Sequence, residues 1–158
     1  MRIRLYCIGK IKEQYLKDGV NEYLKRISAY SNIEIVEVAD SKVKDNPNSS
    51  DIEKAKNEEG ERVLKLLKND YLIGLDLNKK EQTSEEFAEF LQSKLVEGGS
   101  NISFVIGGSY GLSDALKKRC STSISLSKLT FLHQMSRLIL SEQIYRAFKI
   151  LNNETYHK

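Results

Sequence analysis

The chain has 158 residues, of which 40% are hydrophobic and 30% are charged, and its formal net charge is +3. This composition is typical of a single folded domain and argues against an intrinsically disordered chain. No apolar run approaches the roughly 18–20 residues that cross a bilayer. The N-terminal residues also lack the pattern of a signal peptide, so we expect a cytoplasmic protein with no membrane partner.

The first half of the chain alternates between strand-like and helix-like segments. Residues 2–9 form the first predicted strand, and apolar residues over about 12–29 recur at the spacing of an amphipathic helix. Residues 33–39 alternate apolar and polar side chains, which is typical of an edge or half-covered strand. The polar segment 40–50, which holds the only proline, predicts a loop. A helix over about 51–68 follows, with Asp51 as its cap.

The next segments continue this alternation. Residues 71–77 predict a third strand. Thr83 to Glu86 match a capping box at the start of a helix that ends near Val96, before the stop signal Gly98-Gly99. The apolar run 102–106 predicts a fourth strand of the kind that is buried on both faces of a parallel sheet.

The last third of the chain predicts both the fold class and a ligand site. The glycine turn 107–111 precedes a helix that opens at Leu112, residues 123–127 predict a fifth strand, and the last helix begins at about His133. Five strands alternating with five helices predict a single domain, residues 1–158, with a doubly wound and mostly parallel α/β sheet. Open α/β sheets bind ligands at the carboxyl ends of their strands. The loops after the last two strands therefore indicate a small-molecule crevice.

Other catalytic and metal motifs do not fit the sequence. Gly107 to Gly111 matches the G-x-S-x-G turn of serine hydrolases. That mechanism needs an acid and then a histidine later in the chain, and Asp114, the only later aspartate, lies just five residues after Ser109. Neither a Walker A loop nor a dinucleotide-binding glycine pattern occurs. Cys7 and Cys120 are expected to be free thiols, and the two histidines are well separated, so we expect no metal site.

The positive charge is concentrated at the two ends of the chain. Residues 1–30 hold seven Lys or Arg against three Asp or Glu, and residues 128–158 hold five against two. If the ends meet in the fold, they form a basic face that suits a polyanion. The same charges also fit ordinary solvated helix faces.

The last predicted helix carries a wide apolar stripe, which fits packing both on the sheet and against a second subunit. Its apolar residues are Met135, Leu138, Ile139, Leu140, Ile144, Ala147, Phe148 and Leu151. Glu142 and Arg146 are four residues apart, in the order preferred for an ion pair within a helix. The pair either decorates the surface or holds Arg146 toward a ligand.

Five sequence blocks resemble the SPOUT-class methyltransferase family. They are LDL (75–77), FVIGGSYGL (104–112), LSKLTFLHQMSR (126–137), EQIYRAFKI (142–150) and the terminal YHK (156–158). Within that class, the chain is similar to the small bacterial enzymes that methylate N3 of a pseudouridine in large-subunit (23S) ribosomal RNA. The opening RIRLYCIGKIKEQY is similar to the start of these enzymes, so the resemblance covers essentially the whole chain.

The resemblance implies a fold, an assembly and a cofactor. The C-terminal part of the α/β domain would be tied in a trefoil knot, the protein would be a homodimer, and S-adenosylmethionine would be the methyl donor. The residues that it assigns to the cofactor lie on three loops and are Leu75, Gly107, Leu126, Ser127, Lys128, Leu129, Thr130 and Phe131. The glycine turn would then let the backbone approach the ligand closely, which explains Gly107 and Gly108.

The resemblance also assigns roles near the C-terminus. It implies that Arg146, Tyr156 and His157 are catalytic and that His133 and Arg137 contact the substrate. Loss of the N3 proton needs a base or a nearby cation. Arg146, His133, Tyr156 and His157 are the candidates, and the identity of the base stays open. The substrate would be ribosomal RNA within the assembled ribosome.

Two residues depart from the family pattern. Leu132 stands where a proline usually precedes the histidine, and Tyr110 stands where smaller or polar residues are common. Tyr110 either stacks on RNA or cofactor or is a half-exposed packing residue. The alternative function is a non-catalytic RNA- or nucleotide-binding protein with the same fold. Bound S-adenosylmethionine in the purified protein would argue against that alternative.

Overall fold

The structure, a computed structural model, describes residues 1–157 and consists of five strands and five helices in strict alternation. In chain order the elements are β1 (Arg2–Ile8), α1 (Gln14–Ile27), β2 (Asn32–Val38), α2 (Ser49–Leu64), β3 (Tyr71–Leu75), α3 (Ser84–Glu97), β4 (Asn101–Ile106), α4 (Asp114–Arg119), β5 (Thr122–Ile124) and α5 (His133–Leu151). The predicted alternation is confirmed. Lys158, the last residue of the terminal YHK block, lies outside the described residues.

All five strands join one parallel sheet in the order β2-β1-β4-β3-β5. In its register, Leu5 of β1 lies between Ile35 of β2 and Phe104 of β4. The predicted parallel α/β fold is therefore confirmed, and β2 is the edge strand that its alternating pattern predicts. β5, at the other edge, covers Thr122–Ile124 and is shorter than the predicted strand 123–127; beyond it, Ser125 forms only an isolated parallel bridge with Glu81.

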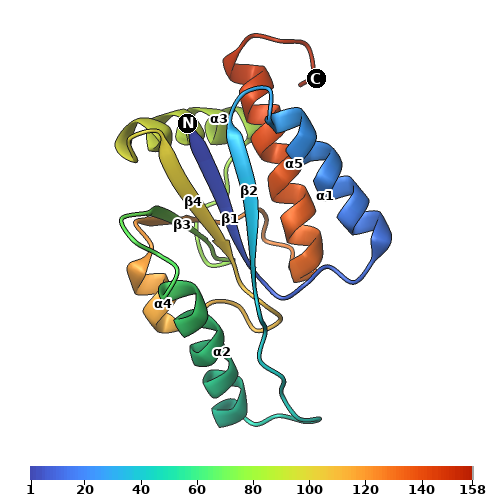
Figure 1. Ribbon diagram of the computed structural model, residues 1–158, viewed down its shortest axis with the longest axis vertical. Coiled ribbons are helices and arrows are strands. Elements are labelled where there is room, and N and C mark those ends of the chain that lie inside the picture. Colours follow the sequence, from blue (N-terminus) through green and yellow to red (C-terminus); the bar gives the residue numbers. More distant parts are fainter. Residues whose placement is uncertain (158) are drawn as a thin grey trace.

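Helices α1, α3 and α5 cover one face of the sheet, and α2 and α4 cover the other (Figure 1). The two faces follow from the alternation of side chains along a strand. Ile3 and Leu5 of β1 belong to the core between the sheet and helices α1, α3 and α5. Tyr6 and Ile8 belong to the core between the sheet and helices α2 and α4. Within His133–Leu151, the helix that packs against both α1 and α3, no residue is fully exposed.

Capping side chains set the helix starts and correct two predicted boundaries. The Asn48 side chain accepts a bond from the Asp51 amide (2.8 Å), and the Asp51 carboxylate accepts one from the Asn48 amide (3.1 Å). Asp51 therefore lies inside the first turn of α2, and Asn48 is the cap, not Asp51. α4 begins at Asp114 and not at Leu112, because the Ser113 hydroxyl accepts an amide hydrogen bond of the first turn at 3.2 Å.

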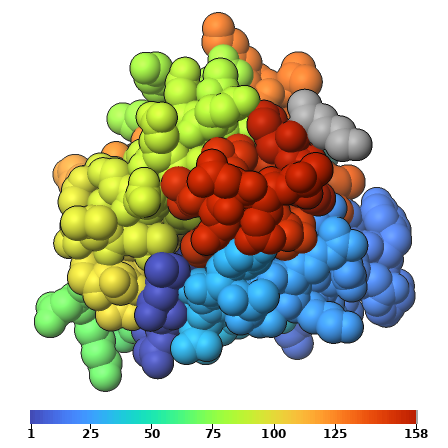
Figure 2. Space-filling model, turned by 90° about the horizontal axis from the view of Figure 1, so that it is seen from above, coloured from blue at the N-terminus to red at the C-terminus, as the bar shows by residue number. Residues whose placement is uncertain are grey.

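The two ends of the chain meet at the edge formed by the amino ends of the strands (Figures 1 and 2). The Tyr30 hydroxyl donates to Glu154, just beyond α5, at 2.9 Å. The cations in this region, Arg26, Arg146 and Lys149, each pair with a glutamate. The ends meet as the basic-face hypothesis requires, but at these three positions a glutamate partly neutralises the positive charge.

Three further predictions from the sequence concern the cysteines, membrane-spanning helices and the knot. Cys7 and Cys120 are free, as predicted. None of the helices in residues 1–157 is both long and apolar enough to cross a membrane. The trefoil knot stays a prediction, because strand order and pairing do not describe how the chain threads.

Candidate functional site

A pocket of about 430 Å³ opens at the carboxyl ends of β3, β4 and β5. Its walls are residues 75–77 at the end of β3, residues 106–111 at the end of β4, residues 125–127 and 129–132 after β5, and His133 and Ser136 of α5. The predicted crevice is present, and it extends to β3. Seven of the eight residues assigned to the cofactor line it, and Lys128 is the exception.

The glycine turn after β4 closes on itself. The Gly111 amide donates to the Gly108 carbonyl (3.1 Å), and Gly111 has a φ of +85°, which favours glycine. A Cβ atom on Gly107 would lie 2.6 Å from the carbonyl carbon of Gly111. Glycine at position 107 is therefore needed to close the turn, whereas the sequence analysis attributes it to the approach of a ligand.

Short polar contacts hold the loop after β5. The Ser125 hydroxyl donates to the Ser127 carbonyl (2.9 Å), and the Ser127 hydroxyl accepts from the Leu129 amide (3.0 Å). The Lys128 amide donates to Glu81 at 3.1 Å. The Lys128 side chain is 87% exposed and its amine lies 3.9 Å from Glu81, so it lies on the outer side of the loop.

Asp76 is a pocket residue that the sequence analysis missed. It follows β3 directly, accepts a bond from the Asn78 amide (3.0 Å), and its side chain is 11% exposed. The nearest cation, the Lys117 amine, is 4.0 Å away. The sequence feature that could have identified Asp76 is its place at the carboxyl end of a buried strand, where α/β proteins place ligand contacts. A carboxylate here can attract a cationic or hydroxyl group of a ligand.

His133 lies in the pocket wall at the start of α5. Its Nε2 atom and the side chain of Asp40 both approach Gly9, at the end of β1. Burial lowers the pKa of His133, the positive charges of Arg137 and Lys12 lower it further, and Asp40 opposes them. The imidazole is therefore neutral at pH 7.

Arg137 is buried beside this site, with 2% of its side chain exposed. One guanidinium nitrogen donates to Glu37 (2.8 Å), and another donates to the Gly9 carbonyl (3.1 Å). Arg137 thus joins α5 to the ends of β1 and β2 and does not line the pocket. Its contact with a substrate stays a prediction, and in this conformation its guanidinium is covered.

The three residues predicted to be catalytic, Arg146, Tyr156 and His157, lie in a second group together with Glu142 and Glu85, and we call these five residues the tail cluster. The predicted ion pair is confirmed, with Arg146 Nη2 at 2.6 Å from Glu142. Arg146 also contacts His157 Nδ1 (3.1 Å) and lies over the Tyr156 ring at 4.7 Å. His157 Nε2 lies 2.6 Å from Glu85. The terminal residues are therefore held against α3 and α5.

The pocket lies at the amino end of α5, and the tail cluster lies toward its carboxyl end. The course of α5 between these two ends can be followed in Figure 1. His133 begins the helix at the pocket, and Arg146 follows thirteen residues later. At 1.5 Å per residue, the two positions are about 20 Å apart along the helix. Within one chain, Arg146 and a ligand in the pocket are therefore too far apart for contact.

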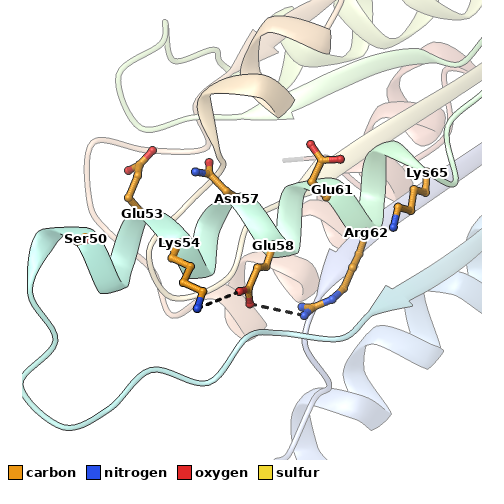
Figure 3. A pocket seen from close by; sticks show the side chains of 8 residues that line it. All are labelled: Ser50, Glu53, Lys54, Asn57, Glu58, Glu61, Arg62 and Lys65. Atoms are coloured by element: carbon orange, nitrogen blue, oxygen red, sulfur yellow. Dashed lines mark ion pairs between the residues drawn. The ribbon is translucent and has the colours of Figure 1, made fainter.

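A larger hollow, of about 610 Å³, runs along the outer side of α2 from Ser50 to Lys65 (Figure 3). Side chains of this one helix line it, and Glu58 lies between Lys54 (4.0 Å) and Arg62 (3.9 Å). Opposite charges at helical spacing are typical of a solvated helix face. In residues 1–157, no three His, Cys, Asp or Glu side chains are grouped so that they could hold a metal ion.

The chain was compared with families and proteins that are already known. The family model described as "Predicted SPOUT methyltransferase" matches residues 1–157. A protein of Acetivibrio thermocellus named ribosomal RNA large subunit methyltransferase H is 48% identical, with all of both chains covered. A protein of the same name from Enterococcus faecalis is 45% identical, again over the full length of both.

A solved structure gives independent support for the fold. It is described as a probable methylase family protein from Haemophilus influenzae. It aligns with a TM-score of 0.51 at 16% identity, over 96% of this chain and 66% of the other. At that identity the likeness concerns the fold alone.

Proposed function

The chain belongs to the SPOUT methyltransferase family, and from this premise we propose that it uses S-adenosylmethionine to methylate N3 of a pseudouridine in large-subunit ribosomal RNA. Full-length similarity to proteins named ribosomal RNA large subunit methyltransferase H carries the proposal. The modest charge of +3 suits docking on a large preformed particle, so we place the reaction on assembled ribosomes.

The residues of the pocket fit this cofactor. A volume of about 430 Å³ is within the range of small-molecule sites. Leu75, Leu126 and Phe131 offer apolar surface for an adenine ring, and Thr130 offers a hydroxyl for its polar groups. Asp76 supplies a negative charge that matches the positive charges of the cofactor. When bound, the cofactor supplies an electrophilic methyl group for direct displacement.

The protein must orient the acceptor and help its N3 proton to leave. The proton is weakly acidic near neutral pH, so a positive charge beside the ring favours the nucleophilic anion. Arg146 carries that charge, and Glu142 fixes its guanidinium through two nitrogens, at 3.0 and 2.6 Å. Tyr156 and His157, on either side of Arg146, position the acceptor ring.

A homodimer brings Arg146 of one subunit close to the pocket of the other subunit. One chain separates Arg146 from the pocket by about 20 Å of helix. In a two-fold dimer with antiparallel α5 helices, the tail cluster of one subunit meets the pocket of the other. Met135 and Ile139 of α5 remain partly exposed in the single chain, which supports this helix as the contact surface.

Mass spectrometry of ribosomal RNA tests the function. RNA from cells that lack this protein is expected to lose one methyl group, on one pseudouridine of the large-subunit RNA. Addition of the purified protein and S-adenosylmethionine to ribosomes from those cells should restore it. Complete methylation in cells without the protein would contradict the proposal.

The pKa of His133 predicts how pH affects cofactor binding. Its pKa in the folded protein lies below the ordinary value of 6.5, so the ring is neutral at pH 7.5 and becomes a cation as the pH falls through that lowered pKa. A cation in the pocket wall repels the positive sulfur of the cofactor. We expect the affinity for S-adenosylmethionine to fall about 3- to 10-fold once the pH drops from neutrality to below that lowered pKa.

Isothermal titration calorimetry measures this effect, with two controls. S-adenosylhomocysteine lacks the positive sulfur, so its affinity should depend less on pH. The variant His133→Gln cannot gain the charge and should flatten the curve for S-adenosylmethionine. Equal pH dependence for the two ligands would exclude this role of His133.

A further inference from the structure

The mouth of the pocket carries exposed apolar side chains. Four pocket residues, which we call the rim, are Leu77 (49% exposed), Tyr110 (40%), Leu129 (70%) and Leu132 (57%). They make up four of the eight large apolar side chains that are exposed in residues 1–157. Scattered apolar residues on a surface are ordinary, but a group around one opening indicates a binding surface.

Local structure holds the rim in place. Leu77 lies in the turn that the Asn78 amide closes on Asp76 (3.0 Å). Tyr110 lies inside the closed glycine turn, and the Leu129 amide is bound by the Ser127 hydroxyl (3.0 Å). Leu132 occupies the cap position of α5, where its side chain makes no capping bond. Leucine is among the poorest caps, so packing against a ligand explains it better than helix stability does.

The surroundings of the rim favour a polyanion. Lys128 is next to Leu129 in the chain and its side chain is 87% exposed. Lys79 and Lys80, in the loop that carries Leu77, are also exposed, and the Lys80 carbonyl accepts a bond from the Ser125 amide of the neighbouring loop (3.3 Å). The acidic residues beside the rim are Glu81, 3.9 Å from the Lys128 amine, and Asp76, directly before Leu77, so the three lysines leave a small positive excess. Three lysines beside an apolar opening suit RNA, which combines flat bases with phosphates.

The route by which a methyl acceptor can reach the pocket also favours RNA as the partner that binds at the rim. The ends of β3, β4 and β5 close the pocket from below, so a methyl acceptor reaches a ligand inside it through the mouth. An acceptor base must leave its stack to present its edge, and it then exposes two apolar faces. The rim offers apolar surface for those faces.

We propose that the rim receives the target base, turned out of the ribosomal RNA, and that Tyr110 stacks on that base or on the one beside it. The inference rests on the proposed function and adds residues that bind the substrate.

Photocrosslinking tests the position directly. The photoreactive residue p-benzoylphenylalanine is placed at position 110 and, as a control, at Leu66, which is 48% exposed at the far end of α2. After irradiation with unmethylated large ribosomal subunits, reverse transcription maps the crosslinks. Position 110 should crosslink to the methylated nucleotide or its neighbours, and position 66 should not. The absence of any crosslink from position 110 to RNA would overturn the proposal.

Steady-state kinetics provide a second measurement. Stacking of one base on an aromatic side chain corresponds to about a 5- to 100-fold change in affinity. Tyr110→Ala should raise the KM for ribosomal subunits within that range and leave the dissociation constant for S-adenosylmethionine unchanged, and Tyr110→Phe should restore the KM. Leu66→Ala is the control and should behave as wild type. An unchanged KM in Tyr110→Ala contradicts the inference, whereas failure of the wild-type protein to methylate ribosomes contradicts the proposed function itself.

Discussion

Replacement of Arg146 by alanine is expected to lower the rate of methyl transfer by at least about 100-fold, because removing a preorganised donor from a developing anion has effects of this size. The affinity for S-adenosylmethionine should not change, because the proposed role of Arg146 is to favour the anion of the acceptor ring and not to bind the cofactor. Single-turnover methylation of ribosomes and calorimetry with the cofactor measure the two quantities. Wild-type activity of the variant would remove Arg146 from the mechanism.

Two variants make this experiment specific. Arg146→Lys keeps the charge but cannot place two nitrogens on one carboxylate, so we expect partial activity. Arg26→Ala is the matched control: Arg26 lies over the Tyr145 ring (5.7 Å) much as Arg146 lies over Tyr156 (4.7 Å). It removes the same charge from the same region, and its activity should stay near that of wild type.

Mixing two inactive variants is expected to restore activity. Arg146→Ala keeps an intact pocket, and Gly107→Val keeps an intact tail cluster but loses the turn in the pocket wall, because its side chain would meet the Gly111 backbone. If each site combines the pocket of one subunit with the tail of the other, a mixed dimer contains one complete site. An equal mixture that exchanges subunits at random should reach about a quarter of wild-type activity.

The same experiment can exclude a site within one chain. In that case every subunit of the mixture would carry either a damaged pocket or a damaged tail, and no activity would return. Size-exclusion chromatography and circular dichroism should first show that Gly107→Val is folded and dimeric. A mixture of Arg146→Ala with wild type, in the same total amount, should keep about half of wild-type activity whether or not subunits exchange, and therefore sets the scale for the number of intact sites.

Most of the fold is encoded in local patterns. The apolar run 102–106 and the helical spacing of 133–151 each predict their element, because side chains repeat every two residues in a strand and every 3.6 in a helix. Local patterns do not decide where a helix begins when two neighbouring residues are both suitable caps. Asn48 and Asp51 both suit a helix start, and only the reciprocal bonds show that Asn48 is the cap.

The pocket could be predicted in part. A resemblance between sequence blocks identified three loops, and seven of eight assigned residues line the cavity. It could not indicate the direction of each side chain: the Lys128 side chain lies on the outer side of its loop, and Asp76, which lines the pocket, was not among the assigned residues. Arg137 appears in the same block as the pocket residues, but it is covered by its contacts with Glu37 and Gly9.

The sequence by itself determined the alternating elements, the parallel sheet and the loops that could bind a ligand, since these follow from periodicity and from short segments. The tertiary structure alone decided that Gly107 serves the closure of its own turn, that apolar side chains surround the pocket mouth, and that Arg146 lies far from that pocket. These properties depend on strand order and on contacts between residues distant in the chain. His133 and Arg146 are thirteen residues apart on one rigid helix, so a single subunit keeps Arg146 about 20 Å from its own pocket.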